Sequence, residues 1–387
     1  MFTYPVLLVT EPDIIHDILA SPCCTNKSVF YKPLNIAVGT GLFSLKDPEW
    51  SVHRKYLNPA FGFKMLQSFM PIFNEEVDKV VELFKETTEF PDVTSLLQNF
   101  TLNVAIRTTM GVNVANEFQN GSKSGIIKSF QCILENLPLM MLINNKLNGD
   151  GGEANLMQGE SKNIFIDQVI ELMKKNVFTL QHVEDESNTI IFGAFETTAN
   201  TIGHILVLLA MFPEFQQKVY EELLAMFPDG GDFDVTYANI QNMTYMDMVI
   251  NESMRLLTPV PFVARENSSD IELSNGMVIP AGVQFVLNIF TMHRGKDLWG
   301  PKADMFDPDH FLPCNMEGKQ PYAFIPFTKG IRNCIGWKYG LMSTKVTLAK
   351  LLRNFKFSTD LQYSDLEFNY AIVLRLKHTP CLRIERR

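Results

Sequence analysis

The chain is most constrained by a glycine-rich segment around one cysteine near its C-terminal end. The segment has the pattern Phe327-x-x-Gly330-x-Arg332-x-Cys334-x-Gly336, and a helical pattern follows it directly. Unpaired backbone N–H groups and the dipole at a helix N-terminus favour negative charge, so this position predicts a lowered thiol pKa and a thiolate. The two glycines would allow positive φ angles and the close approach of a flat group.

Cys334, taken alone, has a simpler interpretation, because most single cysteines are small buried apolar side chains. The fixed glycine, arginine and phenylalanine positions around it favour a ligand instead. A thiolate is an axial ligand of haem iron that promotes O–O bond cleavage, and the Arg332 guanidinium suits a haem propionate. The segment resembles the haem-thiolate loop of the cytochromes P450, and this resemblance implies haem b (heme b) held through the Cys334 sulfur.

The composition is that of a globular protein with a large core. The chain has 387 residues, of which 46% are hydrophobic and 20% charged. This length fits either two domains or one large domain around a cofactor. The 30 phenylalanines and 19 methionines suit a pliable apolar pocket as well as core packing. The net charge of −9 argues against a nucleic acid as partner.

Cysteine spacing and hydropathy bear on the compartment. The six cysteines form no CxxC pairs and no regular framework, which indicates free thiols in a reducing compartment. We find no run of about 18 apolar residues and therefore expect no transmembrane helix. The apolar start of the chain is too short to span a membrane and has no basic leader region, so we expect a strand there.

Hydrophobic periodicity predicts a mainly helical chain with a small amount of strand. The expected helices lie at 66–85, 93–110, 162–176, 184–211, 213–227, 246–257 and 338–352, with a further helix that starts at Glu11. The expected strands lie at 4–9 and, as short runs, within 271–290 and 355–384. Residues 144–155 are typical of a polar loop.

Trp50 and Arg54 are candidates for binding an anion. They are four residues apart in an expected helix, so their side chains share one face. An indole N–H and a guanidinium on one face offer donors to the same anion. The Trp-x-x-x-Arg pattern resembles the cytochrome P450 helix that holds a haem propionate. The alternative is a packed tryptophan beside an arginine that extends to solvent.

The long apolar helix expected at 184–211 contains Glu196 and Thr197 at its centre. A carboxyl and a hydroxyl in such a helix are costly unless they are used. One interpretation is a threonine bonded back to its own helix and a glutamate at the surface. The other resembles the oxygen-activation groove of the P450 central helix, in which Glu196 and Thr197 would relay protons. Gly193 and Ala194 would form that groove, and Gly193 cannot make the ester to haem that a glutamate makes there in some fatty-acid hydroxylases.

Glu252 and Arg255 are three residues apart on an expected helix and can form an ion pair. Surface pairs of this kind are common and contribute little stability. In the P450 pattern the pair is buried and meets a third group from a downstream loop, which here carries His310 where the family usually has arginine. A histidine can still bond the Glu252 carboxylate, although the contact becomes pH-sensitive.

Apolar residues near these motifs are candidates for a substrate pocket. For each of them, core packing is an equally simple explanation. The P450 resemblance also places a propionate contact at Arg265, which follows the pocket segment in the sequence. The candidate pocket residues are Phe192, Phe195, Val260, Phe262 and Val263.

The motifs occur in P450 order, and the resemblance covers essentially the whole chain. It implies a mainly α fold with a small β region, in which a single triangular helical domain of residues 1–387 surrounds a buried haem. The sequence around Cys334 is similar to that of insect microsomal members related to the fatty-acid-hydroxylating group. The implied reaction uses O₂ to hydroxylate or epoxidise an apolar small molecule such as a fatty acid, a hormone-like lipid or a xenobiotic.

The resemblance also implies partners and a location. NADPH would act indirectly, through NADPH–cytochrome P450 reductase, with cytochrome b5 as a further donor. Lys55, Lys329 and Lys338 are candidates for a basic patch that an acidic reductase would contact, although ordinary solvated lysines explain them equally well. The family location is the cytosolic face of the endoplasmic reticulum membrane. This sequence shows no N-terminal anchor, so only association with the membrane surface is expected.

The sequence leaves two alternatives to a monooxygenase. The span of about 130–164 is short for the two lid helices that normally cover the pocket, which would suit a truncated P450-like protein with impaired haem binding and no catalysis. A haem-thiolate isomerase that needs no reductase is the other alternative. The retained pair of Glu196 and Thr197 argues against the isomerase.

Overall fold

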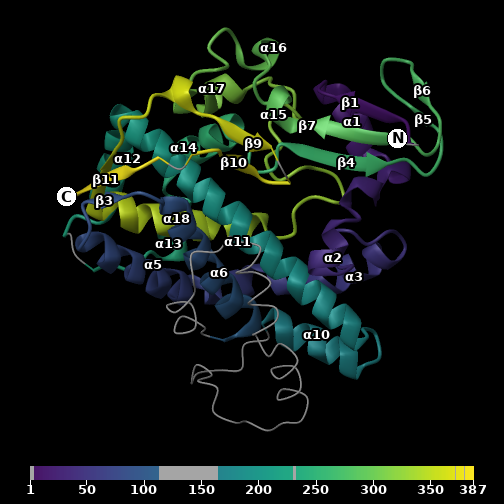
Figure 1. The fold of residues 1–387 in the computed structure, drawn as a ribbon, viewed down its shortest axis with the longest axis horizontal. Helices are drawn as coiled ribbons and strands as arrows, with labels where there is room; N and C mark the ends of the chain where they lie inside the picture. The colour runs from purple at the N-terminus through teal and green to yellow at the C-terminus, as the bar shows by residue number, and fades with distance from the viewer. Residues whose placement is uncertain (1–3, 113–163, 230–231, 371, 379) are drawn as a thin grey trace.

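The computed structural model describes residues 4–112, 164–229, 232–370, 372–378 and 380–387. Its centre is α11 (Leu180–Met211), which crosses the middle of the molecule in Figure 1. Thr179 caps the helix by accepting a hydrogen bond from the His182 N–H at 3.1 Å. This cap explains why the helix starts earlier than the residue 184 that its apolar pattern predicts.

Three further helices pack on α11 and complete the main core. These are α6 (Val93–Met110), α14 (Thr244–Leu256) and α18 (Trp337–Asn354). The bounds of α6 match the prediction, because Asp92 caps its start and Gly111, with φ of 73°, ends it. Among the described helices, α11 alone is long and apolar enough to cross a membrane, and 72% of its most apolar window is buried in the fold.

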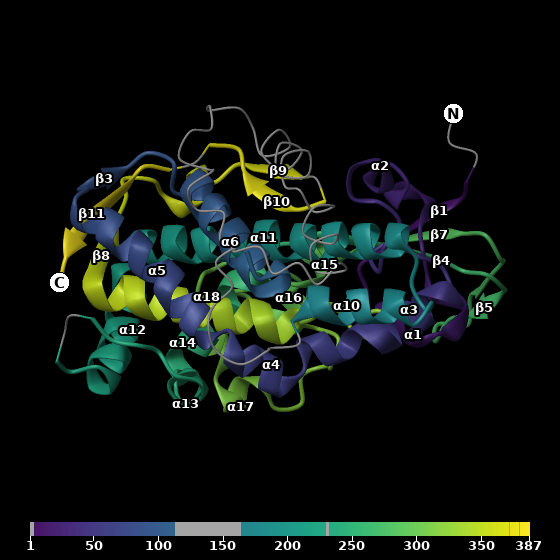
Figure 2. The ribbon, with the colours of Figure 1, turned by 90° about the horizontal axis from the view of Figure 1, so that it is seen from below.

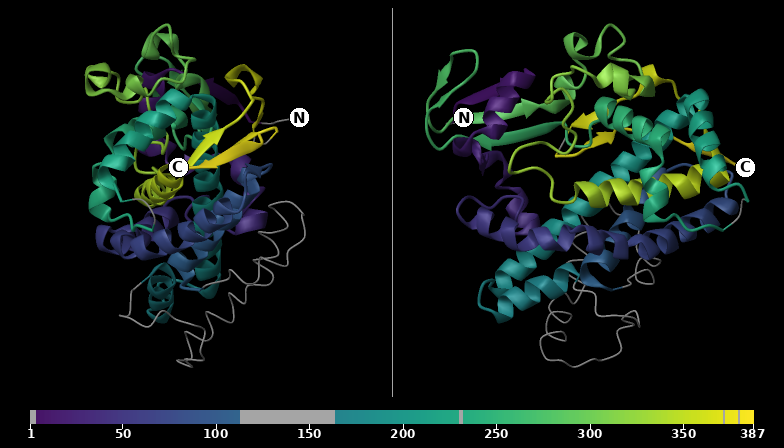
Figure 3. Two further views of the ribbon diagram at one scale, coloured as in Figure 1. Left: turned by 90° about the vertical axis from the view of Figure 1, so that its left-hand side faces the viewer. Right: turned by 180° about the vertical axis from the view of Figure 1, so that it is seen from behind.

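The helix predicted at 66–85 is two helices, α4 (Phe63–Ser68) and α5 (Met70–Lys85). Pro71 lies in the first turn of α5, where its missing N–H costs no hydrogen bond, so the chain breaks just before it. Behind the molecule α5 runs beside α18, as Figure 3 shows. The other helices are α1 (Pro12–Ala20), α2 (Leu34–Val38), α3 (Glu49–Leu57), α10 (Phe165–Lys174), α12 (Pro213–Met226), α13 (Tyr237–Gln241), α15 (Ile289–Met292), α16 (Lys296–Trp299) and α17 (Pro313–Met316).

Short 3₁₀ turns connect several of these elements. They are η1 (Pro22–Cys24), η2 (Val29–Tyr31), η3 (Asn58–Phe61), η4 (Pro308–Phe311) and η5 (Tyr363–Asp365).

The strands form small sheets at the edges of the helical body (Figures 1 and 2). A four-stranded sheet has the order β1-β7-β4-β2, in which only the pair of β1 and β7 is parallel. A three-stranded sheet has the order β3-β11-β8, and β9 pairs with β10, and β5 with β6. The bounds are β1 (Val6–Val9), β2 (Asn26–Lys27), β3 (Glu89–Phe90), β4 (Phe262–Glu266), β5 (Ile271–Glu272), β6 (Val278–Ile279), β7 (Gln284–Asn288), β8 (Phe355–Ser358), β9 (Phe368–Tyr370), β10 (Leu374–Leu376) and β11 (Leu382–Arg386).

The predicted fold class, mainly α with a small β region, is confirmed by this arrangement. The expected strands near the start, around the hairpin at 275–276 and in the C-terminal tail are all present. The polar loop expected at 144–155 and the short lid expected at about 130–164 lie outside the described residues, apart from residue 164. That residues 1–387 form a single domain stays a prediction.

Candidate active site

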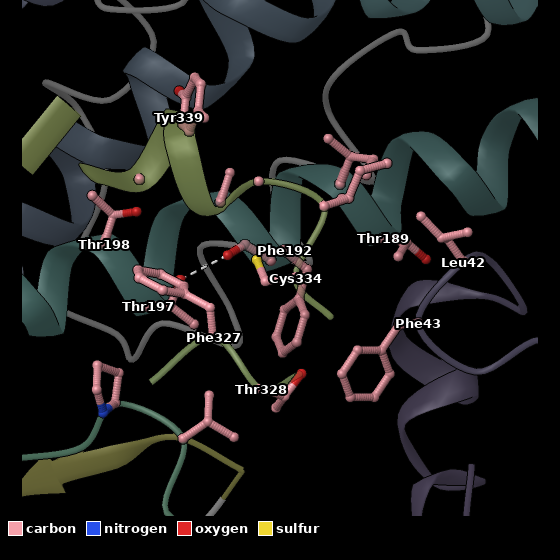
Figure 4. A pocket seen from close by; sticks show the side chains of 18 of the residues that line it. Leu42, Phe43, Thr189, Phe192, Thr197, Thr198, Phe327, Thr328, Cys334 and Tyr339 are labelled. Atoms are coloured by element: carbon pink, nitrogen blue, oxygen red, sulfur yellow. Dashed lines mark hydrogen bonds between the residues drawn. The ribbon is translucent and has the colours of Figure 1, made fainter. Parts of the chain in front are cut away.

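A cavity of about 300 Å³ opens beside α11 at the segment that precedes α18. The side chains labelled around it in Figure 4 come from three parts of the chain. Leu42 and Phe43 follow α2, Thr197 lies on α11, and Cys334 lies on the loop before α18. The lining is mostly apolar, so the cavity suits a flat or elongated apolar molecule with a few polar anchors.

Backbone geometry holds Cys334 at the cavity wall. Its N–H donates to the Phe327 carbonyl at 3.0 Å, which closes the loop on itself. Gly330 has φ of 76°, and a side-chain carbon there would come within 2.2 Å of the Leu19 carbonyl oxygen. Only glycine fits that position. Gly336 differs from the prediction: its φ is −94°, so it caps α18 without needing positive φ.

The Cys334 thiol differs from the prediction in its electrostatics. Burial raises its pKa, and the Gly336 N–H, Arg54 and Lys27 oppose that rise without reversing it. The helix start therefore does not by itself produce a thiolate. The sulfur faces the cavity, which accounts for its exposed side chain, and a cation or metal ion in the cavity would be needed to favour the charged form.

Trp50 and Arg54 share α3 as predicted, and both line the cavity, so their joint binding of one anion stays a prediction. Arg54 donates from Nη1 to the Asn333 carbonyl at 2.8 Å and from Nη2 to the Asn333 Oδ1 at 2.9 Å. It thereby fastens the residue next to Cys334. Trp50 is buried, and its ring lies 4.1 Å from the Arg332 guanidinium carbon. The pair thus supports the cysteine loop from two sides.

Glu196 and Thr197 both line the cavity from α11. Thr197 Oγ1 donates to the Gly193 carbonyl at 2.8 Å, so the hydroxyl bonds back to its own helix (dashed line in Figure 4). Glu196 is buried and pairs with Arg375 of β10, whose Nε donates to Glu196 Oε1 at 2.7 Å. A side-chain carbon at Gly193 would meet no described atom within 4 Å, so the helix is open to the cavity there.

Four of the five candidate pocket residues line the cavity: Phe192, Val260, Phe262 and Val263. Phe195 does not. It is 2% exposed and packs in a buried core cluster that also contains Ile191. The reason is helical rotation, because residue 195 points about 200° away from the open side at Gly193. Phe327 and Gly336 also line the cavity.

The predicted Glu252–Arg255 pair is fully buried and closed. Arg255 donates from Nε to Glu252 Oε2 at 2.7 Å and from Nη2 to Oε1 at 2.8 Å. His310 Nδ1 lies 3.0 Å from Glu252 Oε1, so the histidine takes the third position of the triad. The Glu252 carboxylate also accepts a hydrogen bond from the Asp307 N–H at 2.9 Å. The pair lies away from the cavity and secures the segments on either side of it.

Comparison with similar proteins identifies the family of this chain. The sequence model of the cytochrome P450 family matches residues 1–148 and 145–379. In Drosophila melanogaster, probable cytochrome P450 313a4 is 47% identical over 419 residues, which cover 99% of this chain and 85% of the relative. The chain belongs to the cytochrome P450 family. Probable cytochrome P450 313a3 is 39% identical, with 99% of this chain and 84% of the relative covered, and cytochrome P450 4c3 is 30% identical, with 97% and 79% covered.

This chain is therefore a P450 monooxygenase, an oxidoreductase similar to insect P450s, and neither alternative is favoured. The family implies a haem-thiolate iron. The basic residues beside Cys334 show whether the site fits haem. Lys27 and Arg265 face each other across the β2–β4 register, and Arg332 lies next to them. Like charges opposite one another on neighbouring strands destabilise a sheet unless an anion joins them.

The cations beside Cys334 are short of partners. Arg332 Nε and Nη1 and Arg265 Nη2 are buried without a hydrogen-bond partner among the described residues. Burial and the neighbouring Arg265 lower the pKa of Arg332 to about 9, and burial with the two arginines lowers the pKa of Lys27 well below its usual value. A ligand with two negative charges along one edge would favour the protonated forms of Arg332 and Lys27. The residues therefore fit a haem that presents its two propionates here.

Lys27 is the functional candidate that the sequence did not reveal. It stands in a two-residue strand with no motif around it, and only its pairing with Arg265 brings it to the cavity. The sequence does predict Arg265, although this residue is fully buried and is not among the residues that line the cavity. Arg375, the partner of Glu196, was also missed, because the two residues are 179 positions apart.

Proposed function

We propose that this P450 uses reductase-supplied electrons and O₂ to hydroxylate or epoxidise an apolar small molecule at a haem held by Cys334. The observation that carries the proposal is the position of Cys334 on the wall of an apolar cavity, beside unpaired buried cations and across from Glu196 and Thr197 on α11. Bound haem would supply O₂ binding and reductive cleavage of the O–O bond.

The residues near Cys334 would bind and orient the cofactor. The Cys334 sulfur would bind the haem iron, and the iron would favour its thiolate form. Arg332, Lys27 and Arg265 would neutralise the two propionates. Arg54 would keep the loop in place through Asn333, and Trp50 would support the Arg332 guanidinium. Phe327 and Gly336 would shape the space next to the sulfur.

Glu196 and Thr197 would hold and move protons. The Glu196 carboxyl is buried at the cavity wall, where a proton can pass to the Thr197 hydroxyl of the same helix. In the observed geometry both groups are engaged, Thr197 with the Gly193 carbonyl and Glu196 with Arg375. Proton delivery therefore requires at least one of these contacts to exchange.

The substrate would be apolar, because Phe192, Val260, Phe262 and Val263 offer carbon surface and no charge. Fatty acids, hormone-like lipids and xenobiotics belong to this class. The electron donor would be NADPH–cytochrome P450 reductase, assisted by cytochrome b5, and the location would be the cytosolic face of the endoplasmic reticulum membrane. These assignments follow the family and stay proposals.

A basic patch would guide the reductase to the cysteine loop. Lys55 and Lys338 are exposed, and Lys329 is half-buried with its amine 5.0 Å from the Tyr322 ring centre. Reversal of all three charges should slow reduction by the reductase more than reduction by dithionite. Equal slowing by both reductants would contradict the patch.

The haem-thiolate assignment is tested with Cys334→Ser. We expect the purified wild type, reduced under carbon monoxide, to give the absorbance band of thiolate-ligated haem, and the variant to lose that band. Cys314→Ser is the matched control, because Cys314 is exposed and outside the cavity. Survival of the thiolate band in Cys334→Ser would overturn the assignment. Product formation that needs both NADPH and reductase would exclude an isomerase.

A further inference from the structure

A second, polar pocket lies behind α11, on the side where α6 and β10 meet it. Its volume is about 160 Å³. The start of α6, the middle of α11 and the short strand β10 contribute its walls, and none of these residues lines the apolar cavity. The lining residues are Asp92, Thr94, Ser95, Gln98, Asn200, Gly203, His204, Arg375 and Leu376.

A polar stripe on α11 joins this pocket to the apolar cavity. Glu196, Asn200 and His204 are spaced by four residues each, so their side chains follow one another along one face of the helix. All three are buried, with 3%, 2% and 3% of their surface exposed. Glu196 lies at the cavity, whereas Asn200 and His204 lie at the polar pocket. Such a stripe is unexpected in a helix that is otherwise apolar.

Several buried polar atoms at the pocket have no partner among the described residues. They are Gln98 Nε2, Asn200 Nδ2 and His204 Nδ1. His204 bonds the Leu257 backbone through its ring, and burial lowers its pKa to about 4, so the ring is neutral and Nδ1 is left as an acceptor. Two amide donors and one ring acceptor that converge on a polar space of this size are the setting in which proteins hold ordered water.

Arg375 connects the polar pocket with Glu196, which lines the apolar cavity. Arg375 lines the polar pocket, and its Nε and Nη2 donate to Glu196 Oε1. The side chain is 37% exposed, so it can release the carboxylate and turn to solvent without disturbing the core. An arginine keeps its proton at any working pH, so Arg375 cannot relay one itself. Its role is to hold or release the carboxylate.

We propose that the polar pocket is a hydrated proton-entry site for Glu196, in which water bound by Gln98, Asn200 and His204 delivers protons when Arg375 releases the carboxylate. A solvent hydronium ion loses one proton, each water in the chain accepts one and gives one, and the Glu196 carboxylate becomes a carboxylic acid. Only O–H bonds form and break, and no electron moves. The inference rests on the proposed proton role of Glu196, and it makes Arg375 a positioning residue.

Asn200→Leu tests the site, because the leucine side chain has the same number and branching of heavy atoms as asparagine and offers water no partner. With the haem-loaded enzyme, reductase, NADPH and the fatty acid dodecanoate as the probe, we expect kcat to fall at least about 10-fold. The D₂O solvent isotope effect on kcat should rise, since proton entry then limits turnover. The thiolate spectrum under carbon monoxide and the spectral dissociation constant of dodecanoate should not change.

Asn188→Leu is the matched control. Asn188 is on the same helix and also has an unpartnered buried amide oxygen among the described residues, but it lines neither space. We expect its kcat and isotope effect to equal those of the wild type. Asn200→Ser should recover much of the lost rate, because its hydroxyl can bond water. If Asn200→Leu misfolds, Gln98→Leu carries the same test from α6.

Two measurements separate this inference from the proposed function. Glu196→Gln with wild-type kcat would refute the proton role of Glu196 itself. Loss of kcat in Glu196→Gln together with wild-type kcat and isotope effect in Asn200→Leu would overturn only the polar pocket. A high-resolution crystal structure of the wild type, without any turnover, should show water bonded to Gln98 Nε2 and Asn200 Nδ2. A pocket filled by shifted side chains and free of water would overturn the inference.

Discussion

Two buried groups of arginines in this protein differ in how completely other residues neutralise their positive charge. Arg255 has a carboxylate partner in Glu252 and further acceptors in the carbonyls of His293, Ala303 and Met305. Arg332 and Arg265 form no ion pair among the described residues, and Lys27 adds a third positive charge beside them. Asp47 opposes this charge only in part.

The difference separates a structural network from a ligand site. A closed buried network is satisfied within the chain, so it needs nothing from outside and serves the fold. An open group of buried cations is costly until an anion arrives, so its energy becomes part of the affinity for that anion. A buried arginine therefore stabilises the haem-free protein in the closed network and destabilises it in the open group. The following predictions test this contrast.

Breaking the closed network should give the largest effect. Glu252→Gln leaves the Arg255 guanidinium buried without its counter-charge, so we expect the free energy of unfolding to fall by about 3–5 kcal/mol. Urea unfolding of the purified protein, with and without haem, measures this loss, which should be similar in both forms. Lys46→Ala is the control, since Lys46 and Glu266 form a partly exposed pair 3.0 Å apart, and its loss should cost less than about 1 kcal/mol. Equal losses in the two variants would contradict a closed, buried network.

The open group should behave in the opposite way. Arg332→Met removes one cation of the unbalanced group, so we expect the haem-free protein to be at least as stable as the wild type. Haem affinity should fall about 10- to 100-fold, because charge-assisted hydrogen bonds to a propionate are lost. The rate of haem transfer to an excess of apomyoglobin, together with urea unfolding of the haem-free protein, measures both quantities. A haem-free Arg332→Met protein as unstable as Glu252→Gln would show that this group also belongs to the fold.

The contrast also explains which parts of the site the sequence predicted. Glu252 and Arg255 are three residues apart, and the positions around Cys334 lie within one loop, so local spacing is enough to find them. Lys27 and Arg375 reach the site only through strand pairing and long-range contact, which a local pattern does not contain. The apolar character of Phe195 predicts a place in the pocket, whereas the direction of its side chain depends on which side of α11 faces the cavity.

The pH dependence of the closed network follows from Glu252. Burial alone would raise the pKa of this carboxyl, but the hydrogen bonds from Arg255 and His310 outweigh burial and lower it from the usual 4.5. A carboxyl with a lowered folded pKa stabilises the fold above its unfolded pKa, and this stabilisation is lost as the pH falls through the folded value. We therefore expect the difference in unfolding free energy between wild type and Glu252→Gln to be constant near neutral pH and to shrink below about pH 4.5. A difference that instead grows in acid would contradict this sign.

The smallest effect should come from His310, where the family usually has arginine. His310→Ala removes one contact to Glu252 Oε1, while Arg255 and the Asp307 N–H continue to bond the carboxylate. The free energy of unfolding should therefore fall by about 1 kcal/mol, well short of the loss in Glu252→Gln. His310→Arg should keep the wild-type stability, because a guanidinium can also donate to the carboxylate. Urea unfolding at neutral pH compares the three proteins, and a loss in His310→Ala as large as that in Glu252→Gln would mean that the histidine, and not Arg255, holds the network closed.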